Sequence, residues 1–368
     1  MSLTHLQIRA FRCFEQVELA LSESSNVLLG PNASGKTSLV EAIHFFCLGR
    51  SFRANKLSTL IQHGQSGFRL AARVKDQGGV ERFGRVSRFS NGDVEREIDH
   101  QRIRNLSEFG KLLPVHVVTH EGFLLFDGGP EYRRRFLDYG VFHVEHDFIK
   151  LWKAYRQIHS QRNHLLRSIH HYNKELASWD IELAQCADAL DEQRNNFWSS
   201  YLGYVDKVSE VAGLQLNLEY LRGWKQDEDL LKLLEKGFES DKKLGYTKQG
   251  PHRFDIQVRL NEGLAKHYLS RGQQKLLYYT LLVAQIDMLY DKTGQKVFLA
   301  IDDFSAEVDS ATQQTIVEML KLIADKTQFF FTSLDESVLY RIKWLQDIKG
   351  EQRIFNIKDC CIQPYSTN

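Results

Sequence analysis

VLLGPNASGKTSLVEA, residues 27–42, places a glycine-containing loop between a short apolar run and a helical pattern. The run from Asn26 to Leu29 has the apolar character of a buried strand, and apolar residues recur at helical spacing from Leu39 onward. Between them, residues 30–37 fit G-x-x-x-x-G-K-[ST] at every fixed position. The N–H groups of such a loop and the N-terminus of the following helix together cradle phosphates. The sequence therefore predicts that this chain binds a nucleoside triphosphate.

The same loop provides the predicted ligands of ATP and of its metal ion. Lys36 is placed to reach the β- and γ-phosphates, and the hydroxyl of Thr37 is placed to hold Mg²⁺. The alternative is a glycine turn with a chance lysine, and the flanking strand and helix argue against it. The predicted ATP-binding residues of the loop are Gly30, Pro31, Asn32, Ala33, Ser34, Gly35, Lys36, Thr37 and Ser38.

A second apolar run, VFLAIDD at residues 297–303, ends in two carboxylates, which is the Walker B pattern. Asp302 is the predicted partner of Thr37 in holding Mg²⁺, and Asp303 is placed to polarise the attacking water. Many buried strands end in an acid, so this pattern alone is a weak indication. It indicates Walker B because a P-loop precedes it in the chain. Because the two motifs lie near opposite ends of the chain, both ends must contribute to one ATPase lobe.

LSRGQ at residues 269–273 matches L-S-x-G-Q and directly precedes a long predicted helix. A serine and glycine amides at a helix N-terminus form an anion site. In the ATP-binding-cassette superfamily, this site serves the γ-phosphate held by the P-loop of a second subunit. The alternative is an ordinary helix with Ser270 as its N-cap. Ser270, Gly272 and Gln273 are therefore further candidate ATP ligands, and the candidate catalytic residues are Lys36, Asp302, Asp303 and Ser270.

Residues 305–309, SAEVD, follow the two acids at the position of the cassette D-loop, a segment that crosses a dimer interface. Together with the L-S-x-G-Q segment, they predict that ATP is sandwiched between two copies of this chain. Two sites with shared ligands would make the homodimer ATP-dependent by mass action.

Composition limits the function less than the motifs do. The chain has 368 residues, long enough for a full hydrophobic core and more than one lobe. Lys and Arg total 48 against 47 acidic residues, so overall charge indicates no nucleic-acid partner, and such a partner would need a local basic patch. None of the 5 cysteines forms a C-x-x-C pair, which predicts neither a zinc site nor a secreted disulfide framework.

Targeting and membrane signals are absent from the sequence. The first residues contain no basic segment followed by an apolar one, and no run approaches the ~18 apolar residues of a membrane span. Only 5 prolines argue against long disordered linkers. We therefore expect a soluble, cytoplasmic protein.

The segments between the motifs predict a β-subdomain and a helical insert. Runs at 68–74 and 80–86 predict a hairpin, and Asn91-Gly92 offers a second tight turn. From 131 to 211, apolar residues recur at the three- and four-residue steps of amphipathic helices. We predict an α/β fold, in which an ABC/SMC-head-like P-loop ATPase lobe with an antiparallel β-subdomain carries an inserted, mainly helical domain. The predicted boundaries are 1–125 and 241–368 for the ATPase domain and 126–240 for the insert.

Several segments resemble the RecF family, a group of relatives of the SMC-type head ATPases, and the resemblance covers essentially the whole chain. The G-P-x-x-R-R-x-F-L-D and G-P-H-[RK] elements are not general cassette features, so they point to this family. The matching segments are residues 30–37, GRSFR at 49–53, GGPEYRRRFLD at 128–138, GPHR at 250–253, LSRGQ at 269–273 and DDF at 302–304.

The resemblance implies an ATP-gated dimer that binds double-stranded DNA, especially beside single-stranded gaps. It also implies a role in recombinational repair and replication restart, with RecR and RecO as partners in loading RecA, and a link to the SOS response. The enzymatic activity that it implies is a weak, DNA-stimulated hydrolysis of ATP, used as a conformational switch.

Three positions depart from the pattern of the resembled proteins. Ala33 replaces a glycine common in their P-loop, which removes no phosphate ligand. His120 replaces a proline usual before Glu121, in the region equivalent to the Q-loop. Thr332 or Ser333 stands where cassette ATPases carry a switch histidine, and we therefore expect slow hydrolysis.

Two sets of basic residues are candidates for DNA contacts through salt-sensitive binding to phosphates. For each residue, the alternative is an ordinary solvated surface. The first set follows the P-loop helix and comprises Arg50, Arg53 and Lys56, while the second lies along the insert and comprises Lys150, Lys153 and Arg156, continuing to Arg162 and Arg167.

Two further groups of residues, one of arginines and one of histidines, do not by themselves indicate a binding site. Arg133, Arg134 and Arg135 are equally compatible with ion pairs inside the fold and with DNA contacts. The insert also contains several histidines with no carboxylate or cysteine framework, which we interpret as surface residues and not as metal ligands. They are His159, His164, His170 and His171.

Two other functions would also use a P-loop. The ATPase subunit of a membrane transporter is the main alternative, and the large helical insert and the missing switch histidine argue against it. A small-molecule P-loop kinase leaves residues 269–273 unexplained. The sequence favours an ATP-dependent DNA-binding clamp over both.

Overall fold

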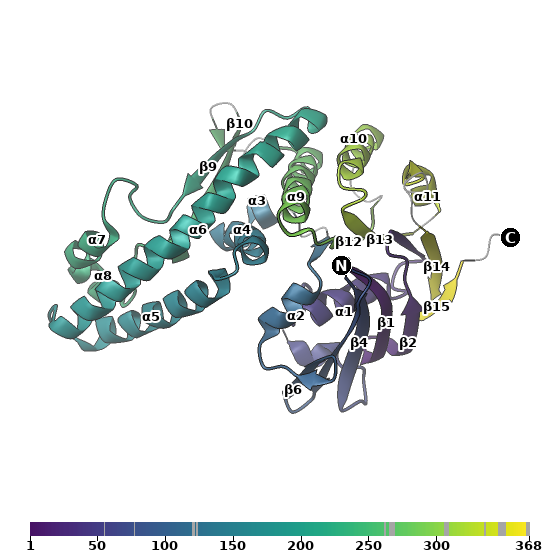
Figure 1. Cartoon of the computed structure of the whole chain (residues 1–368), viewed down its shortest axis with the longest axis horizontal. Helices are drawn as coiled ribbons and strands as arrows, with labels where there is room; N and C mark the ends of the chain where they lie inside the picture. Colours follow the sequence, from purple (N-terminus) through teal and green to yellow (C-terminus); the bar gives the residue numbers. More distant parts are fainter. Residues whose placement is uncertain are drawn as a thin grey trace. The chain divides into compact units, whose positions relative to one another are not determined.

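The chain divides into two compact units (Figure 1). The computed structural model describes residues 1–54, 56–76, 78–119, 122, 124–260, 263–264, 269–304, 309–334, 336–344 and 351–365. Unit 1 comprises residues 1–122 and 286–368, and unit 2 comprises residues 123–285. Both ends of the chain therefore build unit 1, which contains the P-loop and the two strand-end acids.

Unit 1 contains a six-stranded antiparallel sheet in the order β2-β1-β4-β5-β6-β7. Along β1, buried Leu6 and Ile8 alternate with exposed Gln7 and Arg9, so one face of the sheet packs on the core and the other faces outward. The predicted hairpin is confirmed, because β4 and β5 pair directly and β6 adds the next antiparallel strand. The strands are β1 (Ser2–Phe11), β2 (Phe14–Ala20), β4 (Gly67–Lys75), β5 (Glu81–Phe89), β6 (Val94–Ile98) and β7 (Gln101–Arg102).

The second sheet of unit 1 has the strand order β15-β14-β3-β13-β12-β8 and is parallel except at β15. β3, β12 and β13 are buried along their whole length, as expected for parallel strands covered on both faces. β3 and β12 both pair with β13, so the segments that follow them lie at one edge of the sheet. The strands are β3 (Ser25–Leu29), β8 (Val115–Val118), β12 (Val297–Ile301), β13 (Thr327–Ser333), β14 (Gln352–Lys358) and β15 (Cys361–Pro364).

One hydrophobic core joins the first helix of unit 1 to residues of both sheets. The ring of Phe68 on β4 meets Phe11 and Phe45 edge to face, at centroid distances of 5.0 and 5.2 Å. The helix that follows the P-loop is therefore held from two sides. The helices of unit 1 are α1 (Lys36–Leu48), α2 (Leu106–Leu112), α10 (Ser310–Lys321) and α11 (Ser337–Arg341), with a 3₁₀ turn η1 (Leu57–Leu60).

Unit 2 is mainly helical, and α5 and α6 run alongside each other (Figure 1). α6 is a single helix of 39 residues. A small antiparallel sheet has the order β11-β10-β9. The elements are α3 (Leu124–Asp127), α4 (Pro130–Val144), α5 (Phe148–Ser168), α6 (Lys174–Ala212), β9 (Asn217–Leu221), α7 (Leu230–Lys236), α8 (Phe238–Leu244), η3 (Pro251–Arg253), β10 (Asp255–Leu260), β11 (Gly263–Leu264) and the first part of α9 (Arg271–Thr293).

Unit 2 ends at residue 285, whereas the sequence placed this boundary after residue 240. Residues beyond 240 belong to unit 2 because β10 pairs with β9 and because two arginines of α4 hold its start. Arg133 donates to both carboxylate oxygens of Asp255, at 2.7 and 3.1 Å, and Arg134 donates to the carbonyl of Phe254 at 2.8 Å. The structural interpretation therefore applies to these two arginines, while Arg135 is exposed.

His159 is not the surface residue that we predicted. Its ring centroid lies 4.2 Å from that of His252. Nε2 of His252 donates to the carbonyl of Thr247 at 3.0 Å, so Nδ1 of the neutral ring accepts a 2.6 Å hydrogen bond from the hydroxyl of Tyr155. Burial lowers the pKa of His159 to about 4 and that of His252 to about 3, so both rings are neutral at pH 7. The other insert histidines, His164, His170 and His171, are exposed.

Arg162 lies in the interior of unit 2 and cannot contact DNA, contrary to our expectation. Its side chain is 0% exposed. The guanidinium donates to Asp180 at 2.6 Å and to Asp241 at 2.8 Å. Burial raises the pKa of Asp180 and the charge of Arg162 lowers it, so the ionised carboxylate depends on the arginine. The pairs join α5, α6 and α8.

Replacing Arg162 by methionine should lower the free energy of unfolding of unit 2 by about 3–5 kcal/mol, because it leaves two carboxylates buried without a cation. Urea denaturation followed by tryptophan emission measures this, since four of the five tryptophans, Trp152, Trp179, Trp198 and Trp224, belong to unit 2. Lys153→Met, at an exposed position of the same helix, is the matched control and should change stability by less than about 0.5 kcal/mol. Equal effects of the two variants would contradict this role of Arg162.

Candidate functional site

The P-loop follows β3 and is fixed by backbone contacts to neighbouring strands. The N–H of Gly30 donates to the carbonyl of Ser333 on β13 at 3.2 Å. A Cβ at position 30 would lie 2.2 Å from the carbonyl oxygen of Ile357 on β14, so a larger residue cannot fit there without movement of the backbone. The sheet itself therefore sets the course of the loop.

Two residues of the loop have a left-handed backbone, Gly35 with φ 111° and Ala33 with φ 62°. Glycine adopts this region freely, whereas it costs an L-residue about 1–2 kcal/mol. Ala33 therefore stands at a position that glycine would fill at lower cost. The alanine keeps its N–H group, so the number of possible phosphate donors in the loop is unchanged.

Lys36 is the first residue of α1, and its ammonium group lies over the loop. Nζ donates to the carbonyls of Gly30 at 2.6 Å and Pro31 at 2.8 Å. Burial lowers the pKa of Lys36, while the charges of Asp303 and Asp302 raise it. The P-loop lysine and the two strand-end acids therefore share one electrostatic environment.

Thr332 on β13 links the two acids. Its hydroxyl donates to the carboxylate of Asp302 at 2.7 Å and accepts from the N–H of Asp303 at 2.9 Å. Thr332 is 0% exposed, and Asp303 has a left-handed φ of 53°. The sequence left open whether Thr332 or Ser333 stands at the switch position. In the structure Thr332 contacts both acids, which makes it a positioning residue for them.

Replacing Thr332 by valine should lower the rate of ATP hydrolysis at least tenfold while leaving ATP affinity within about threefold. Valine keeps the volume but leaves the N–H of Asp303 without this acceptor, at a cost of about 1–3 kcal/mol. Steady-state hydrolysis and nucleotide titration measure the two effects separately. Thr332→Ser retains the hydroxyl and should restore the rate, and failure to do so would contradict the role of that hydroxyl.

Thr37 and Asp302 fit a magnesium ion by the chemistry of their donor atoms. A hydroxyl and a carboxylate are hard oxygen ligands, and Mg²⁺ in nucleotide sites takes one or two carboxylates together with waters and phosphate oxygens. Thr37 is half-buried at the start of α1, and Asp302 is close enough to Lys36 to affect its pKa. Among the described residues, no group of three or more His, Cys, Asp or Glu could hold a metal ion without the nucleotide.

The L-S-x-G-Q segment forms a capping box at the N-terminus of α9. The N–H of Gln273 donates to the hydroxyl of Ser270 at 3.3 Å, and the N–H of Ser270 donates to the side-chain oxygen of Gln273 at 2.9 Å. Ser270 and Gln273 are exposed, and a Cβ at Gly272 would meet no atom of the described residues within 4 Å. The structure therefore shows the predicted cap and leaves the helix start open to an anion from outside.

The predicted site residues fall into both units. Unit 1 brings together Lys36, Thr37, Asp302 and Asp303, while unit 2 carries Ser270, Gly272 and Gln273. The Q-loop residues His120 and Glu121 and the D-loop residues 305–308 lie outside the described residues.

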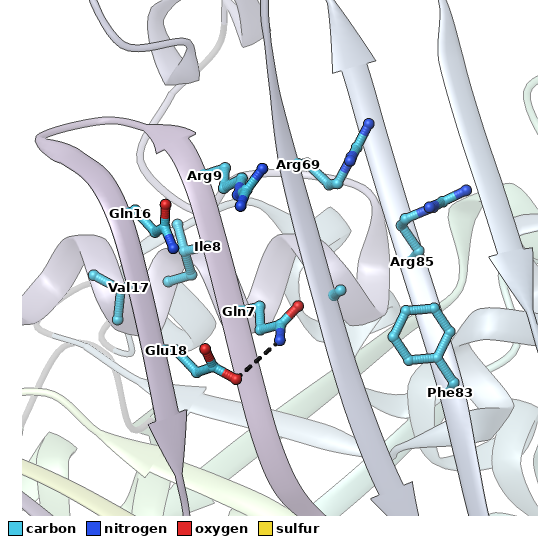
Figure 2. Close-up of a pocket in the computed structure, with 10 residues that line it drawn as sticks. Gln7, Ile8, Arg9, Gln16, Val17, Glu18, Arg69, Phe83 and Arg85 are labelled. Atoms are coloured by element: carbon cyan, nitrogen blue, oxygen red, sulfur yellow. Dashed lines mark hydrogen bonds between the residues drawn. The ribbon is translucent and has the colours of Figure 1, made fainter.

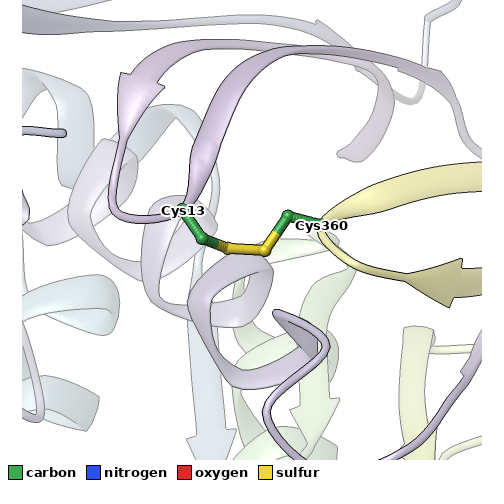
Figure 3. The surroundings of a disulfide bond; sticks show 2 residues. All are labelled: Cys13 and Cys360. Carbon is green, nitrogen blue, oxygen red and sulfur yellow. A yellow bond between two sulfur atoms is a disulfide. The ribbon is translucent and has the colours of Figure 1, made fainter. Parts of the chain in front are cut away.

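Cys13 and Cys360 form a disulfide beside the P-loop (Figure 3). The two residues are 347 positions apart in the sequence, and their Cα atoms lie 6.1 Å apart. The N–H of Cys360 donates to the carbonyl of Ser34 at 3.1 Å, and a Cβ at Gly35 would lie 3.1 Å from the sulfur of Cys13. The bridge therefore packs directly on the loop. No pattern in the sequence indicated this bridge, because no local spacing connects the two cysteines.

Sequence reasoning also missed an ion pair that supports α1. Glu41, which is 0% exposed, accepts two hydrogen bonds of 2.8 Å from Arg12 and one from the hydroxyl of Ser51. The hydroxyl of Ser51 in turn accepts from the N–H of Arg53 at 2.9 Å. This network fixes the GRSFR segment against α1. The sequence signal that could have indicated this ion pair is the acid Glu41 between apolar residues of the P-loop helix.

Apart from the buried Arg162, the basic residues predicted to contact DNA are exposed, and they lie in both units. Arg50, Arg53 and Lys56 follow α1 in unit 1, and Lys153 lies on α5 in unit 2. On the same helix, Lys150 pairs with Asp147 at 2.8 Å, and Arg156 lies over the ring of Trp152 at 4.7 Å. The first set and the second set belong to separate units.

In the parallel sheet, the P-loop after β3 and the two acids after β12 lie on either side of β13. This arrangement, together with an L-S-x-G-Q helix start, defines an ABC-type ATPase. The comparison with known families specifies it further. The family model "RecF/RecN/SMC N terminal domain" matches residues 2–355. None of the helices within the described ranges is both long and apolar enough to cross a membrane.

Individual relatives agree with this match. The chain is 38% identical to the DNA replication and repair protein RecF of Edwardsiella ictaluri, over 87% of this chain and 90% of that protein. It is 36% identical to the protein of the same name from Pectobacterium atrosepticum, over 97% of both. A solved structure of "the recombination mediator protein RecF-ATP in RecFOR pathway" superposes with a TM-score of 0.86 at 25% identity, covering 99% of this chain and 98% of that one.

The chain belongs to the RecF family of SMC-like, ABC-type ATPases. The predicted fold class and the resemblance seen in the sequence are thereby confirmed. The ATP-bound neighbour supports ATP as the nucleotide. Membership of a family named for DNA replication and repair favours that role over the transporter and kinase alternatives.

Proposed function

We propose that this chain is an ATP-gated, dimeric DNA-binding protein of recombinational repair and replication restart. It binds double-stranded DNA and junctions between duplex and single-stranded gaps, and together with RecO and RecR it helps to load RecA as part of the SOS-linked response. The names of its relatives and of the RecFOR pathway support this role. A DNA partner implies a location in the bacterial cytoplasm.

Each site residue has a proposed part in the ATP cycle. Lys36 binds the β- and γ-phosphates, Thr37 and Asp302 hold Mg²⁺, and Asp303 polarises the attacking water. Magnesium supplies charge neutralisation at the phosphates when it is bound. The loop N–H groups from Gly30 to Ser38 surround the phosphates. Hydrolysis is slow and DNA-stimulated, and it opens a dimer that ATP has closed.

The exposed N-terminus of α9 is the observation that supports an ATP site shared between two copies of the chain. Ser270 and Gly272 present a hydroxyl and a backbone amide to solvent, with space above the glycine. The positive end of a 23-residue helix attracts an anion at this place. The γ-phosphate bound by the P-loop of a second copy is the anion that this arrangement suits. ATP then acts as a bridge between two copies.

The proposed contacts to DNA are electrostatic. Arg50, Arg53 and Lys56 in unit 1, with Lys150, Lys153 and Arg156 in unit 2, are exposed cations able to meet phosphates. Binding through such residues weakens steeply as the salt concentration rises, and it does not depend on base sequence.

Sedimentation velocity with and without ATP and gapped DNA, across a salt series, tests this function. We expect a monomer without nucleotide, a dimer with ATP, and a stronger dimer when gapped DNA is added at low salt. Blunt duplex of the same length is the control for gap preference. A chain that stays monomeric with ATP would contradict the shared site, and a chain that never associates with DNA at low salt would contradict the clamp.

A further inference from the structure

The outward face of the antiparallel sheet contains a basic groove that the nucleotide site does not use. The groove has a volume of about 260 Å³ and lies over β1, β2, β4 and β5 (Figure 2). Its charged lining residues are Arg9, Arg69, Arg85 and Glu18. The excess of arginine over acid marks this face as a site for an anion.

Arg9 on β1 and Arg69 on β4 are directly opposite each other in the strand register. Residues in this arrangement have Cβ atoms about 4.5–5.5 Å apart, and like charges there destabilise a sheet. Both side chains are exposed, and within the described ranges neither makes a hydrogen bond or an ion pair. Figure 2 shows the two side chains next to each other above the sheet. The pair therefore costs stability, and no acid among the described residues pairs with either side chain.

Three other arginines of the same sheet are paired with acids. Arg85 contacts Glu97, Arg73 lies 3.6 Å from Glu81, and Arg82 lies 3.5 Å from Asp99. The acid nearest the pair in the groove, Glu18, accepts a 3.0 Å hydrogen bond from Gln7 instead of contacting an arginine. The absence of an acid beside Arg9 and Arg69 thus contrasts with the pairing of these three arginines.

We propose that Arg9 and Arg69 form a binding site for the phosphate backbone of DNA on the outward face of the antiparallel sheet. Guanidinium groups match phosphate oxygens in a bidentate manner, and two of them side by side can hold neighbouring phosphates. A bound phosphate also removes the repulsion between the two cations. The groove lies on an exposed sheet surface, which a polymer can cross. This proposal rests on the DNA-binding function proposed above and adds a surface distinct from the residues that follow α1.

The double variant Arg9→Gln/Arg69→Gln tests the site in the full chain, with a fluorescent gapped duplex, ATP and a salt series followed by anisotropy. Two lost phosphate contacts should reduce the slope of log affinity against log salt by about 2 and weaken binding about 10- to 100-fold at 0.1 M salt. Arg82→Gln is the matched control, because Arg82 is exposed on β5 but paired with Asp99, and it should bind like the unmodified chain. The melting temperature of the double variant should be unchanged or higher, since it loses a repulsion.

A second double variant separates the effect of positive charge from the effect of the guanidinium shape. Arg9→Lys/Arg69→Lys keeps both cations and should retain the salt slope of the unmodified chain. Equal affinity and slope for the glutamine variant and the unmodified chain would overturn this site while leaving the proposed function intact, and would assign the pair to another anion, such as an acidic protein surface. A salt slope in the lysine variant as low as that of the glutamine variant would also overturn it, because lysine keeps both charges. No DNA binding by the unmodified chain would instead contradict the proposed function itself.

Discussion

Replacing Lys36 by methionine should weaken ATP binding more than 100-fold. Nζ of Lys36 lies 2.6 and 2.8 Å from two loop carbonyls, and in the bound state it must exchange them for phosphate oxygens. Hydrogen bonds to charged groups are worth about 1.5–3 kcal/mol each, so two of them give about 3–6 kcal/mol. Methionine retains the aliphatic stem, which limits the effect on folding. Titration with a fluorescent ATP analogue, checked by calorimetry, measures the affinity.

Lys36→Arg separates binding from hydrolysis at the same position. The guanidinium preserves the charge, so ATP should still bind, but its planar fork cannot take the place of a compact ammonium between the loop and the γ-phosphate. We expect hydrolysis to fall at least tenfold with affinity within about tenfold. Ala33→Gly, in the same loop, is the control and should retain both properties. A methionine variant that binds ATP within threefold of the unmodified chain would show that Lys36 is not a phosphate ligand.

The parts of the site that the sequence predicted are those encoded by continuous segments. The P-loop, the strand-end acids and the L-S-x-G-Q helix start each combine a backbone shape with nearby side chains, so spacing alone identifies them. The hairpin of β4 and β5 and the buried strand β12 were predicted for the same reason, from local alternation and from an apolar run.

The features that were missed depend on contacts between distant segments. Thr332 became a positioning residue only when β12 and β13 placed it beside Asp302 and Asp303. Arg162 follows the same polar pattern as its exposed neighbours on α5, and only Asp180 and Asp241, from two other helices, explain its burial. Tertiary packing decides whether such a polar residue is buried and which residues it contacts. The pattern of residues along one helix or strand does not carry this information.

The repulsive pair Arg9 and Arg69 belongs to this group as well. Each arginine alone is an ordinary exposed residue of a half-buried strand, and β1 and β4 are separated by a long stretch of sequence. The register of β1 with β4 is what brings two like charges together. Electrostatic conflict inside a fold is therefore visible only in the structure, and here it points to a ligand outside the chain.

Replacing Ser270 by arginine should abolish ATP-dependent dimerisation while leaving ATP binding by the monomer unchanged. The new side chain would fill the open space above the start of α9, where the γ-phosphate of a second copy is proposed to sit. The P-loop lies in unit 1, and its phosphate ligands are untouched. Sedimentation velocity with ATP measures dimerisation, and nucleotide titration measures binding. Ser160→Arg, at an exposed position of α5, is the matched control and should dimerise normally.

A mixture of two inactive variants tests the shared site most directly. In a dimer of one Lys36→Met chain and one Ser270→Arg chain, one composite site carries both substitutions and the other carries neither. The second site combines the intact P-loop of the Ser270→Arg chain with the intact helix start of the Lys36→Met chain. Mixing should therefore restore ATP-dependent association and part of the hydrolysis that each variant lacks alone. Full dimerisation of Ser270→Arg by itself, or no gain on mixing, would show that each copy completes its ATP site without the other.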